Sequence, residues 1–244
     1  MSISGLFRDE FANFMIKGRK LISRDTAILR VAFPMLKDSW GEDFVPIAKF
    51  PKSFCVMVGK CPDAFKPYTP VQVTNDYMDL LVKGYKGGRV SCGLFESKEG
   101  DRLVLKGPRE KLNVKVLDEA KRIIAFAGGT GIAPIYQVLK YLKDVGKDIK
   151  VILFYANKTK DDILLCDELR ELSHEISGLE IRNIIENERG YLNESDIKDI
   201  TVNSSDCVLI CGPKGFNELL LGNNETGRIG LLNNKFSKEQ IFKF

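Results

Sequence analysis

The chain has 244 residues, which suits one large or two small domains. Its 44% hydrophobic and 29% charged residues are typical of a globular protein and exclude a disordered or fibrous chain. No apolar run approaches the roughly 20 residues that cross a bilayer. Met1–Lys20 mixes charged and apolar residues and looks like neither a signal peptide nor an anchor. We therefore expect a soluble, cytoplasmic monomer, held at the cytosolic face of a membrane only through a partner.

The net charge of +4 is unevenly distributed along the chain. Residues 1–120 hold 20 Lys and Arg against 15 Asp and Glu, whereas residues 121–244 hold 17 against 18. This excess is too sparse for a nucleic-acid-binding stripe. The basic first half suits an acidic protein partner. The alternative is that the uneven distribution of charge arises by chance and has no function.

Cysteine and histidine usage excludes several kinds of site. The six cysteines are scattered, as expected for reduced thiols of an intracellular protein: Cys55, Cys61, Cys92, Cys166, Cys207 and Cys211. Their spacing fits neither a zinc site nor a plant-type iron–sulfur site, so we expect no metal. His174 is the only histidine, which excludes a bis-histidine haem and a Ser-His-Asp or Cys-His catalytic site on this chain.

The first 110 or so residues predict an antiparallel β-barrel. Short apolar and β-branched runs alternate with Gly and Pro turn signals, and one short helix is expected at 91–96. The expected strands are 20–33 with a polar break at 23–26, 53–58, 77–85 and 102–106. Several short strands with regular turns are typical of a barrel.

The second half alternates strands and helices. The expected strands are 123–127, 151–156, 179–185 and 208–211, and the expected helices are 133–143 and 162–175. Repeated strand–helix units predict a doubly wound parallel sheet. The chain turns charged near 110–119, so we place the domains at 1–112 and 113–244.

The segment Gly128–Pro134 reads Gly-Gly-Thr-Gly-Ile-Ala-Pro and joins an expected strand to an expected helix. Glycines permit close backbone approach, and a helix N-terminus offers amides to a phosphate. The dehydrogenase fingerprint is not matched, because Pro134 stands at the third glycine position and no acid lies about 20 residues further on. The loop alone predicts either a nucleotide phosphate site or a simple tight turn.

Two more motifs narrow this choice. Residues 66–71 read Lys-Pro-Tyr-Thr-Pro-Val, and residues 211–216 read Cys-Gly-Pro-Lys-Gly-Phe. In this order the three motifs resemble the ferredoxin–NADP reductase superfamily, and most closely its NADH–cytochrome b5 reductase branch. Segments 21–26, 154–165, 190–194 and 242–244 are similar to the same branch, so the resemblance runs from about Phe14 to Phe244.

The resemblance implies a flavin site in the first domain. Lys66, where relatives carry arginine, would pair with the FAD pyrophosphate, Tyr68 would pack along the isoalloxazine, and the Thr69 hydroxyl would approach N5. A lysine offers a point charge rather than a bidentate fork. The other implied contacts are Pro67, Leu81, Lys83, Tyr85, Gly88, Arg89, Val90 and Ser91. By the alternation of a strand, Leu81, Lys83 and Tyr85 would lie on one face, and Ser91 would cap a helix. The alternative to a flavin contact is a simple proline-bounded edge strand at 67–70, and for Arg89 it is a side chain that is only solvated.

The resemblance also implies an NADH site in the second domain. Gly129, Thr130, Gly131, Ala133 and Pro134 would hold the dinucleotide, with Ala133 in place of a family serine or threonine. A Glu186 carboxylate would accept from a ribose hydroxyl and repel a 2′-phosphate, which favours NADH over NADPH. Near the nicotinamide the resemblance implies Cys211, Gly212, Pro213, Phe216 and the C-terminal Phe244. A solvated Glu186 and a simple strand end at Cys211 are the alternatives.

The implied activity is hydride transfer from NADH to FAD, followed by single-electron delivery. Thr69 and Cys211 would be the catalytic residues. The acceptor must be a separate molecule, because the chain has neither haem ligands nor a cluster motif; cytochrome b5 or another acidic protein fits best. The alternatives are a related reductase for a ferric chelate, quinone or other haem protein, and a non-catalytic flavin relay subunit.

Overall fold

The computed structural model describes residues 5–33, 44–223, 225–233 and 235–244. Met1–Ser4, part of the N-terminal segment expected not to be an anchor, lie outside the described residues. The chain divides into two compact units, Met1–Lys111 and Leu112–Phe244. In the described part, no helix is long and apolar enough to cross a membrane.

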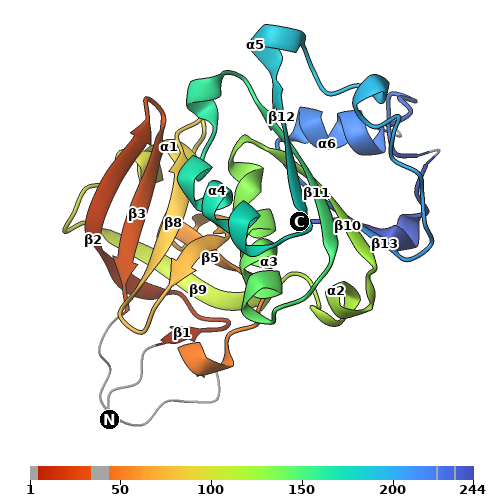
Figure 1. Cartoon of the computed structure of the whole chain (residues 1–244). Helices are drawn as coiled ribbons and strands as arrows, with labels where there is room; N and C mark the ends of the chain where they lie inside the picture. Colours follow the sequence, from red (N-terminus) through yellow and green to blue (C-terminus); the bar gives the residue numbers. More distant parts are fainter. Residues whose placement is uncertain (1–4, 34–43, 224, 234) are drawn as a thin grey trace. The chain divides into compact units, whose positions relative to one another are not determined.

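The first unit is a seven-stranded antiparallel sheet in the order β6-β5-β9-β2-β3-β8-β7. Figure 1 shows its neighbouring strands β2, β3 and β8 side by side. Its strands are β2 (Ala12–Ser23), β3 (Thr26–Ala32), β5 (Phe54–Cys61), β6 (Ala64–Tyr68), β7 (Pro70–Val73), β8 (Tyr77–Lys83) and β9 (Arg102–Glu110). A small sheet pairs β1 (Gly5–Phe7) with β4 (Phe44–Pro46), next to the 3₁₀ helix η1 (Ile47–Lys49). The single α-helix described in this unit is α1 (Ser91–Phe95).

Chain continuity brings the two ends of this sheet together. The strands β6 and β7 stand at opposite ends of the strand order, yet only Thr69 separates them in the sequence. One residue spans less than about 4 Å, so the two edge strands must meet at Thr69. The sheet therefore curls into the predicted barrel, and the 66–69 motif lies at its seam.

The strands β2 and β9 extend beyond the bounds predicted from the sequence. β2 begins at Ala12 rather than Lys20, because Phe14 and Ile16 are buried on one face and Met15 is exposed on the other. β9 continues through Gly107-Pro108 to Glu110. Its pairing with β5 shifts register between Cys55 and Met57. The predicted break at 23–26 is the β2–β3 turn, with Ser23 opposite Thr26.

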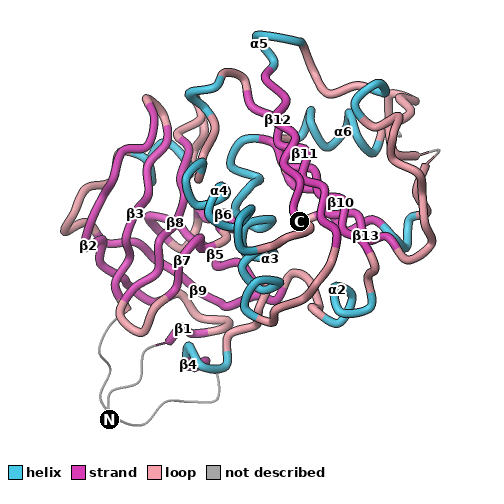
Figure 2. The backbone as a smooth tube through the Cα atoms, viewed as in Figure 1, coloured by secondary structure: helices cyan, strands magenta, loops and turns pink. Residues whose placement is uncertain are grey.

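The second unit is a five-stranded parallel sheet in the order β12-β11-β10-β13-β14. Figure 2 labels its strands β10, β11, β12 and β13. The strands are β10 (Arg122–Gly128), β11 (Lys150–Asn157), β12 (Leu179–Ile185), β13 (Asp206–Cys211) and β14 (Ile241–Lys243). The helices are α2 (Lys115–Glu119), α3 (Ile132–Asp144), α4 (Cys166–Glu175), α5 (Glu186–Arg189) and α6 (Lys214–Leu221), with short 3₁₀ turns η2 (Gly129–Gly131), η3 (Lys160–Asp162), η4 (Glu194–Asp196) and η5 (Lys238–Gln240).

Both faces of the parallel sheet are covered, which explains its near-continuous apolar strands. Figure 1 shows α3 and α4 on one face and α6 on the other. On the α6 face, Phe126 and Phe154 stack with their ring centroids 4.9 Å apart inside a buried cluster that includes Leu220. The sheet thereby fixes the positions of the loops at the carboxyl ends of its strands.

The helix predicted at 162–175 begins four residues later, at Cys166. Leu165 has a φ of 57°, a left-handed conformation that helical residues do not adopt. The preceding residue is held away from the helix because its amide donates to the hydroxyl of Tyr155 at 3.0 Å. A long-range hydrogen bond therefore overrides the local helical pattern.

We predict that the buried Arg122–Asp206 pair stabilises the second unit. Arg122 donates to both carboxylate oxygens of Asp206, at 2.9 and 2.6 Å, and that side chain is 1% exposed. Arg122→Met should lower the free energy of unfolding by about 3–5 kcal/mol, because it leaves a buried carboxylate without its cation. Denaturant unfolding measures the loss.

The matched control is Arg170→Met. The Arg170–Asp167 pair lies at 3.1 Å on the surface, with the two side chains 65% and 83% exposed. Its removal should change stability by less than about 0.5 kcal/mol. Equal losses in the two variants would contradict a special role for the buried pair.

Candidate functional site

The 66–69 motif is placed beside the other flavin residues by strand pairing within the first unit. Lys66 and Tyr68 pair with Val58 and Val56 of β5. Immediately after the motif, Pro70 pairs with Leu80 of β8. The barrel seam therefore sets Thr69 next to the strand that carries Leu81 and Lys83.

Tyr68 and Tyr85 come close together at this seam. Burial, together with the smaller effect of the nearby Tyr85, raises the pKa of Tyr68 to about 12. Pro67, by contrast, is exposed and pairs with Met57. Aromatic side chains of this kind suit packing against an isoalloxazine ring.

The expectation that Leu81, Lys83 and Tyr85 share one strand face is wrong for Tyr85. β8 ends at Lys83, and Tyr85 lies beyond it in the segment that leads to α1, so strand alternation does not apply to it. Leu81 is 3% exposed, whereas Lys83 is partly buried and forms an ion pair with Asp25 at 3.2 Å.

The turn after Tyr85 is closed by close contacts. A Cβ on Gly88 would lie 2.2 Å from the Ser91 hydroxyl, so only glycine fits there. That hydroxyl accepts from the Tyr85 amide at 3.3 Å, and the Cys92 thiol donates to the Tyr85 carbonyl at 2.8 Å. The predicted helix cap at Ser91 is therefore wrong: the N-cap of α1 is Val90, and the serine hydroxyl is used to close the turn.

The charges on these segments fit an anionic cofactor. Lys66 and Arg89 are both exposed, and neither forms an ion pair with another described residue. Two unpaired cations, one on each flavin motif, leave positive charge available for a diphosphate. The residues of the first unit therefore fit FAD.

In the second unit, the glycine loop and the Cys-Gly-Pro turn are in direct contact. Ala127 of β10 pairs with Cys211 of β13, and a Cβ on Gly131 would lie 2.1 Å from the Cys211 carbonyl oxygen. The Phe216 ring covers both segments, since a Cβ on Gly128 or Gly212 would strike it at 3.1 or 2.4 Å. Two motifs 80 residues apart therefore form one backbone surface.

Helix α3 starts from this surface. Gly129–Gly131 form a 3₁₀ turn, Gly129 has a φ of 53°, and the buried Ala133 and Pro134 occupy the first helical turn. The first amides of a helix lack intrahelical acceptors and attract anions. Thr130 lies in this turn at the helix start, as the sequence predicted for a phosphate-binding loop.

Glu186 lies at the next strand end, as the first residue of α5 directly after β12. Its carboxylate accepts a hydrogen bond from the exposed Tyr191, which raises the pKa of that phenol. The Asn187 amide donates to the Lys158 carbonyl at 3.1 Å and ties α5 to the loop after β11. The carboxylate is thus available at the same sheet edge as the glycine loop.

The C-terminal residue also reaches this edge. β14 pairs in parallel with β13, and the Phe244 amide donates to the Ile210 carbonyl at 3.0 Å. The Phe244 ring contacts Phe242 edge to face, with centroids 4.9 Å apart. Phe244 therefore lies beside the strand that ends in Cys211.

Unpaired polar atoms concentrate at the same edge. The described residues have four buried side-chain N or O atoms without a hydrogen bond, and three belong to Asn157 and Asn217. Asn157 ends β11, and Asn217 follows the Cys-Gly-Pro turn, where its Nδ2 donates to the Gly212 carbonyl at 2.9 Å. Unpaired buried amides are costly, so their presence here fits a polar ligand such as a dinucleotide.

The sequence analysis did not single out Asn217 or Tyr155 as site residues. Asn217 is one of several polar residues at the start of α6, and Tyr155 lies inside the apolar β11 run. Their hydrogen bonds to backbone carbonyls leave no mark in an apolar–polar pattern.

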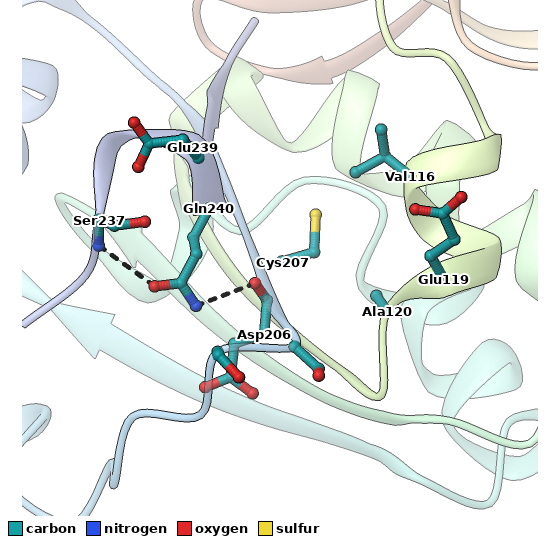
Figure 3. Close-up of a pocket in the computed structure, with 10 residues that line it drawn as sticks. Val116, Glu119, Ala120, Asp206, Cys207, Ser237, Glu239 and Gln240 are labelled. Atoms are coloured by element: carbon teal, nitrogen blue, oxygen red, sulfur yellow. Dashed lines mark hydrogen bonds between the residues drawn. The ribbon is translucent and has the colours of Figure 1, made fainter.

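A pocket of about 520 Å³ lies elsewhere in the second unit (Figure 3). It is lined at the amino end of β13 by Asp206 and Cys207, and by residues of α2 and η5. The Cys207 thiol points into it, and burial raises the pKa of that thiol to about 11. Because parallel strands share one direction, this pocket is at the edge opposite the glycine loop.

Comparison with known proteins agrees with both sets of residues. The model of the oxidoreductase FAD-binding domain matches residues 13–114, and that of the oxidoreductase NAD-binding domain matches residues 126–220. NADH-cytochrome b5 reductase 1 of Dictyostelium discoideum is 32% identical over 96% of this chain and 82% of its own. NADH-cytochrome b5 reductase 1 of Aspergillus terreus is 34% identical over 84% of this chain and 73% of its own.

Solved structures show the same fold. The cytochrome b5 reductase domain of Ulva prolifera nitrate reductase matches with a TM-score of 0.76 over 98% of each chain, at 23% identity. Phthalate dioxygenase reductase matches with a TM-score of 0.69 over 97% of this chain and 68% of its own, at 20% identity.

These matches confirm the predicted fold of a barrel followed by a parallel α/β domain, and the predicted cofactors FAD and NADH. The individual site residues stay predictions. The chain belongs to the NADH–cytochrome b5 reductase family of flavin-dependent oxidoreductases.

Proposed function

We propose that this chain passes electrons from NADH through FAD to cytochrome b5, at the residues named above. What supports the acceptor is the name shared by the curated relatives, together with the basic excess of residues 1–120. Cytochrome b5 or another acidic haem protein would be attracted to that half of the chain.

Bound FAD would accept the hydride of NADH as an electron pair and release the electrons one at a time. No side chain has to move a proton for this step, so the protein contributes positioning and electrostatics. Lys66 and Arg89 would neutralise the FAD diphosphate, Tyr68 would support the ring, and the Thr69 hydroxyl would lie at the reacting edge.

On the second unit, the start of α3 would hold the dinucleotide phosphates through backbone amides. Glu186 would accept from the adenosine ribose, and Asn157 lies between these two segments in the sheet order. Cys211 would lie against the nicotinamide at the turn that contacts Gly131.

The decisive experiment is the absorption spectrum of the purified protein. Flavin bands that bleach when NADH is added in the absence of oxygen, and return when cytochrome b5 is added, support the proposal. A colourless protein that binds no added FAD would defeat it. Bleaching without re-oxidation by cytochrome b5 would leave the flavin chemistry intact and point to another acceptor.

We predict that Lys66 retains the flavin through its charge. Lys66→Ala should weaken FAD binding about tenfold, the value of one charge-assisted contact, whereas Lys66→Arg should preserve or tighten it. Flavin fluorescence after dilution measures the dissociation constant. Lys86→Ala is the control, since Lys86 is an exposed neighbouring cation outside the proposed contacts. FAD binding that is unchanged in Lys66→Ala contradicts the pyrophosphate role.

We predict a preference for NADH that depends on Glu186. Glu186→Ala should lower the ratio of kcat/KM for NADH to kcat/KM for NADPH by about tenfold, because a charged hydrogen bond to the ribose is lost. Glu188→Ala on the same helix is the matched control, since that carboxylate pairs with Lys160 at 2.9 Å. Equal efficiency of NADPH with the parent protein would overturn the assignment.

We predict that electron transfer to cytochrome b5 slows as ionic strength rises, while reduction by NADH changes little. Exposed charges are screened over about 10 Å at 0.1 M salt, whereas contacts inside a binding site are not. Stopped-flow measurement of the two half-reactions separates the effects.

Charge reversal at Lys49 and Lys52 should slow the second half-reaction only. Both lysines are exposed and form no ion pair with a described residue, whereas Lys60 is a poorer probe because it pairs with Asp101 at 3.8 Å. Lys198→Glu in the second unit is the control. If neither salt nor these charge reversals change the rate of electron transfer to cytochrome b5, a small-molecule acceptor becomes the better assignment.

A further inference from the structure

The Tyr155 hydroxyl connects two loops at the carboxyl edge of the parallel sheet. It accepts from the Leu164 amide at 3.0 Å, and its single proton faces the carbonyls of Gly129 at 3.3 Å and Leu164 at 3.4 Å. The side chain is fully buried, and burial keeps the hydroxyl protonated by raising its pKa. This contact joins the glycine loop to the segment before α4.

The contact acts on the carbonyl of a glycine in the left-handed region. Gly129 has a φ of 53°, and a Cβ added there would meet no atom within 4 Å, so no group packs on that side of the residue. Its carbonyl also accepts from the Ile132 amide, and the Tyr155 hydroxyl supplies the second donor. Together these two donors fix which way the carbonyl points.

A trans peptide is planar, so its carbonyl and its amide point in opposite directions. When the Gly129 carbonyl points inward to Tyr155, the amide of the same peptide, on Thr130, points away from the β11 side of the loop. That amide belongs to the helix start at which an anion is favoured. A buried hydroxyl therefore controls the direction of a backbone dipole.

We propose that Tyr155 is a positioning residue for NADH, which orients the Gly129–Thr130 peptide toward the phosphates of the dinucleotide. This inference rests on the proposed NADH site and adds a residue to it. Phenylalanine at this position would fill the same space but leave the carbonyl and the Leu164 amide without the hydroxyl.

The test is Tyr155→Phe in the FAD-loaded protein. The dissociation constant for NAD⁺ and the KM for NADH should rise about three- to tenfold, the range expected for one lost hydrogen bond. The kcat at saturating NADH and the affinity for FAD should stay unchanged. Isothermal titration with NAD⁺ provides a readout that does not depend on turnover.

Tyr141→Phe is the matched control. Its hydroxyl donates to Asp118 at 3.0 Å on the surface of the same unit, away from the glycine loop. It should leave NAD⁺ affinity unchanged. A Tyr155→Phe variant that loses thermal stability but binds NAD⁺ like the parent would show a purely structural role and overturn the proposal.

A second variant keeps the test independent of the β11 core. Gly129→Ala meets no neighbouring atom, yet its φ of 53° is strained for alanine, so it disturbs the same peptide. In a double-mutant cycle, the two substitutions should weaken NAD⁺ binding by less than the product of their separate effects. Independent effects would overturn the proposal. Failure of NADH to reduce the parent flavin would instead refute the proposed function.

Discussion

Each candidate site contains a glycine whose neighbours leave no room for a β-carbon in the present conformation. Gly131 lies against the Cys211 carbonyl in the second unit, and Gly88 lies against the Ser91 hydroxyl in the first. A β-carbon on Gly131 would sit 2.1 Å from a backbone oxygen, and one on Gly88 would sit 2.2 Å from the Ser91 hydroxyl and 2.9 Å from the Tyr85 carbonyl oxygen, so either would force its neighbours to move. These contacts fix the shape of each loop, and the ligand-facing groups take their positions from that shape.

The two units reach this result by different topologies. In the barrel, consecutive strands stand at opposite ends of the sheet, so the chain itself closes the seam at Thr69. In the parallel sheet, strands far apart in sequence end at one edge, so Gly128, Asn157, Ile185 and Cys211 terminate adjacent strands. Functional residues gather at that edge because βαβ connections return every strand in the same direction.

The sequence could predict the parts of this architecture that depend on local pattern. Alternation and turn residues predicted the barrel, and apolar runs between amphipathic segments predicted the parallel sheet. Local pattern failed where a side chain competes for a backbone group: the Leu164 amide is taken by Tyr155, so α4 starts late, and the Ser91 hydroxyl is taken by the Tyr85 amide, so it does not cap α1. Tyr155 and Asn217 escaped the sequence analysis because a hydrogen bond to a backbone carbonyl leaves no mark in an apolar–polar pattern.

The departures from the family pattern fall on side chains, while the backbone constraints are kept. Lys66 replaces an arginine and Ala133 replaces a hydroxyl, yet the glycines that permit close approach at 88 and 131 are present. Hydride transfer requires distance and alignment rather than proton transfer by a side chain, and backbone geometry supplies both. A lost side-chain contact therefore lowers affinity by a modest factor, whereas a displaced loop would misalign the reacting atoms. In the proposed sites, the loss of one side-chain contact should therefore cost less than a displacement of the glycine loops.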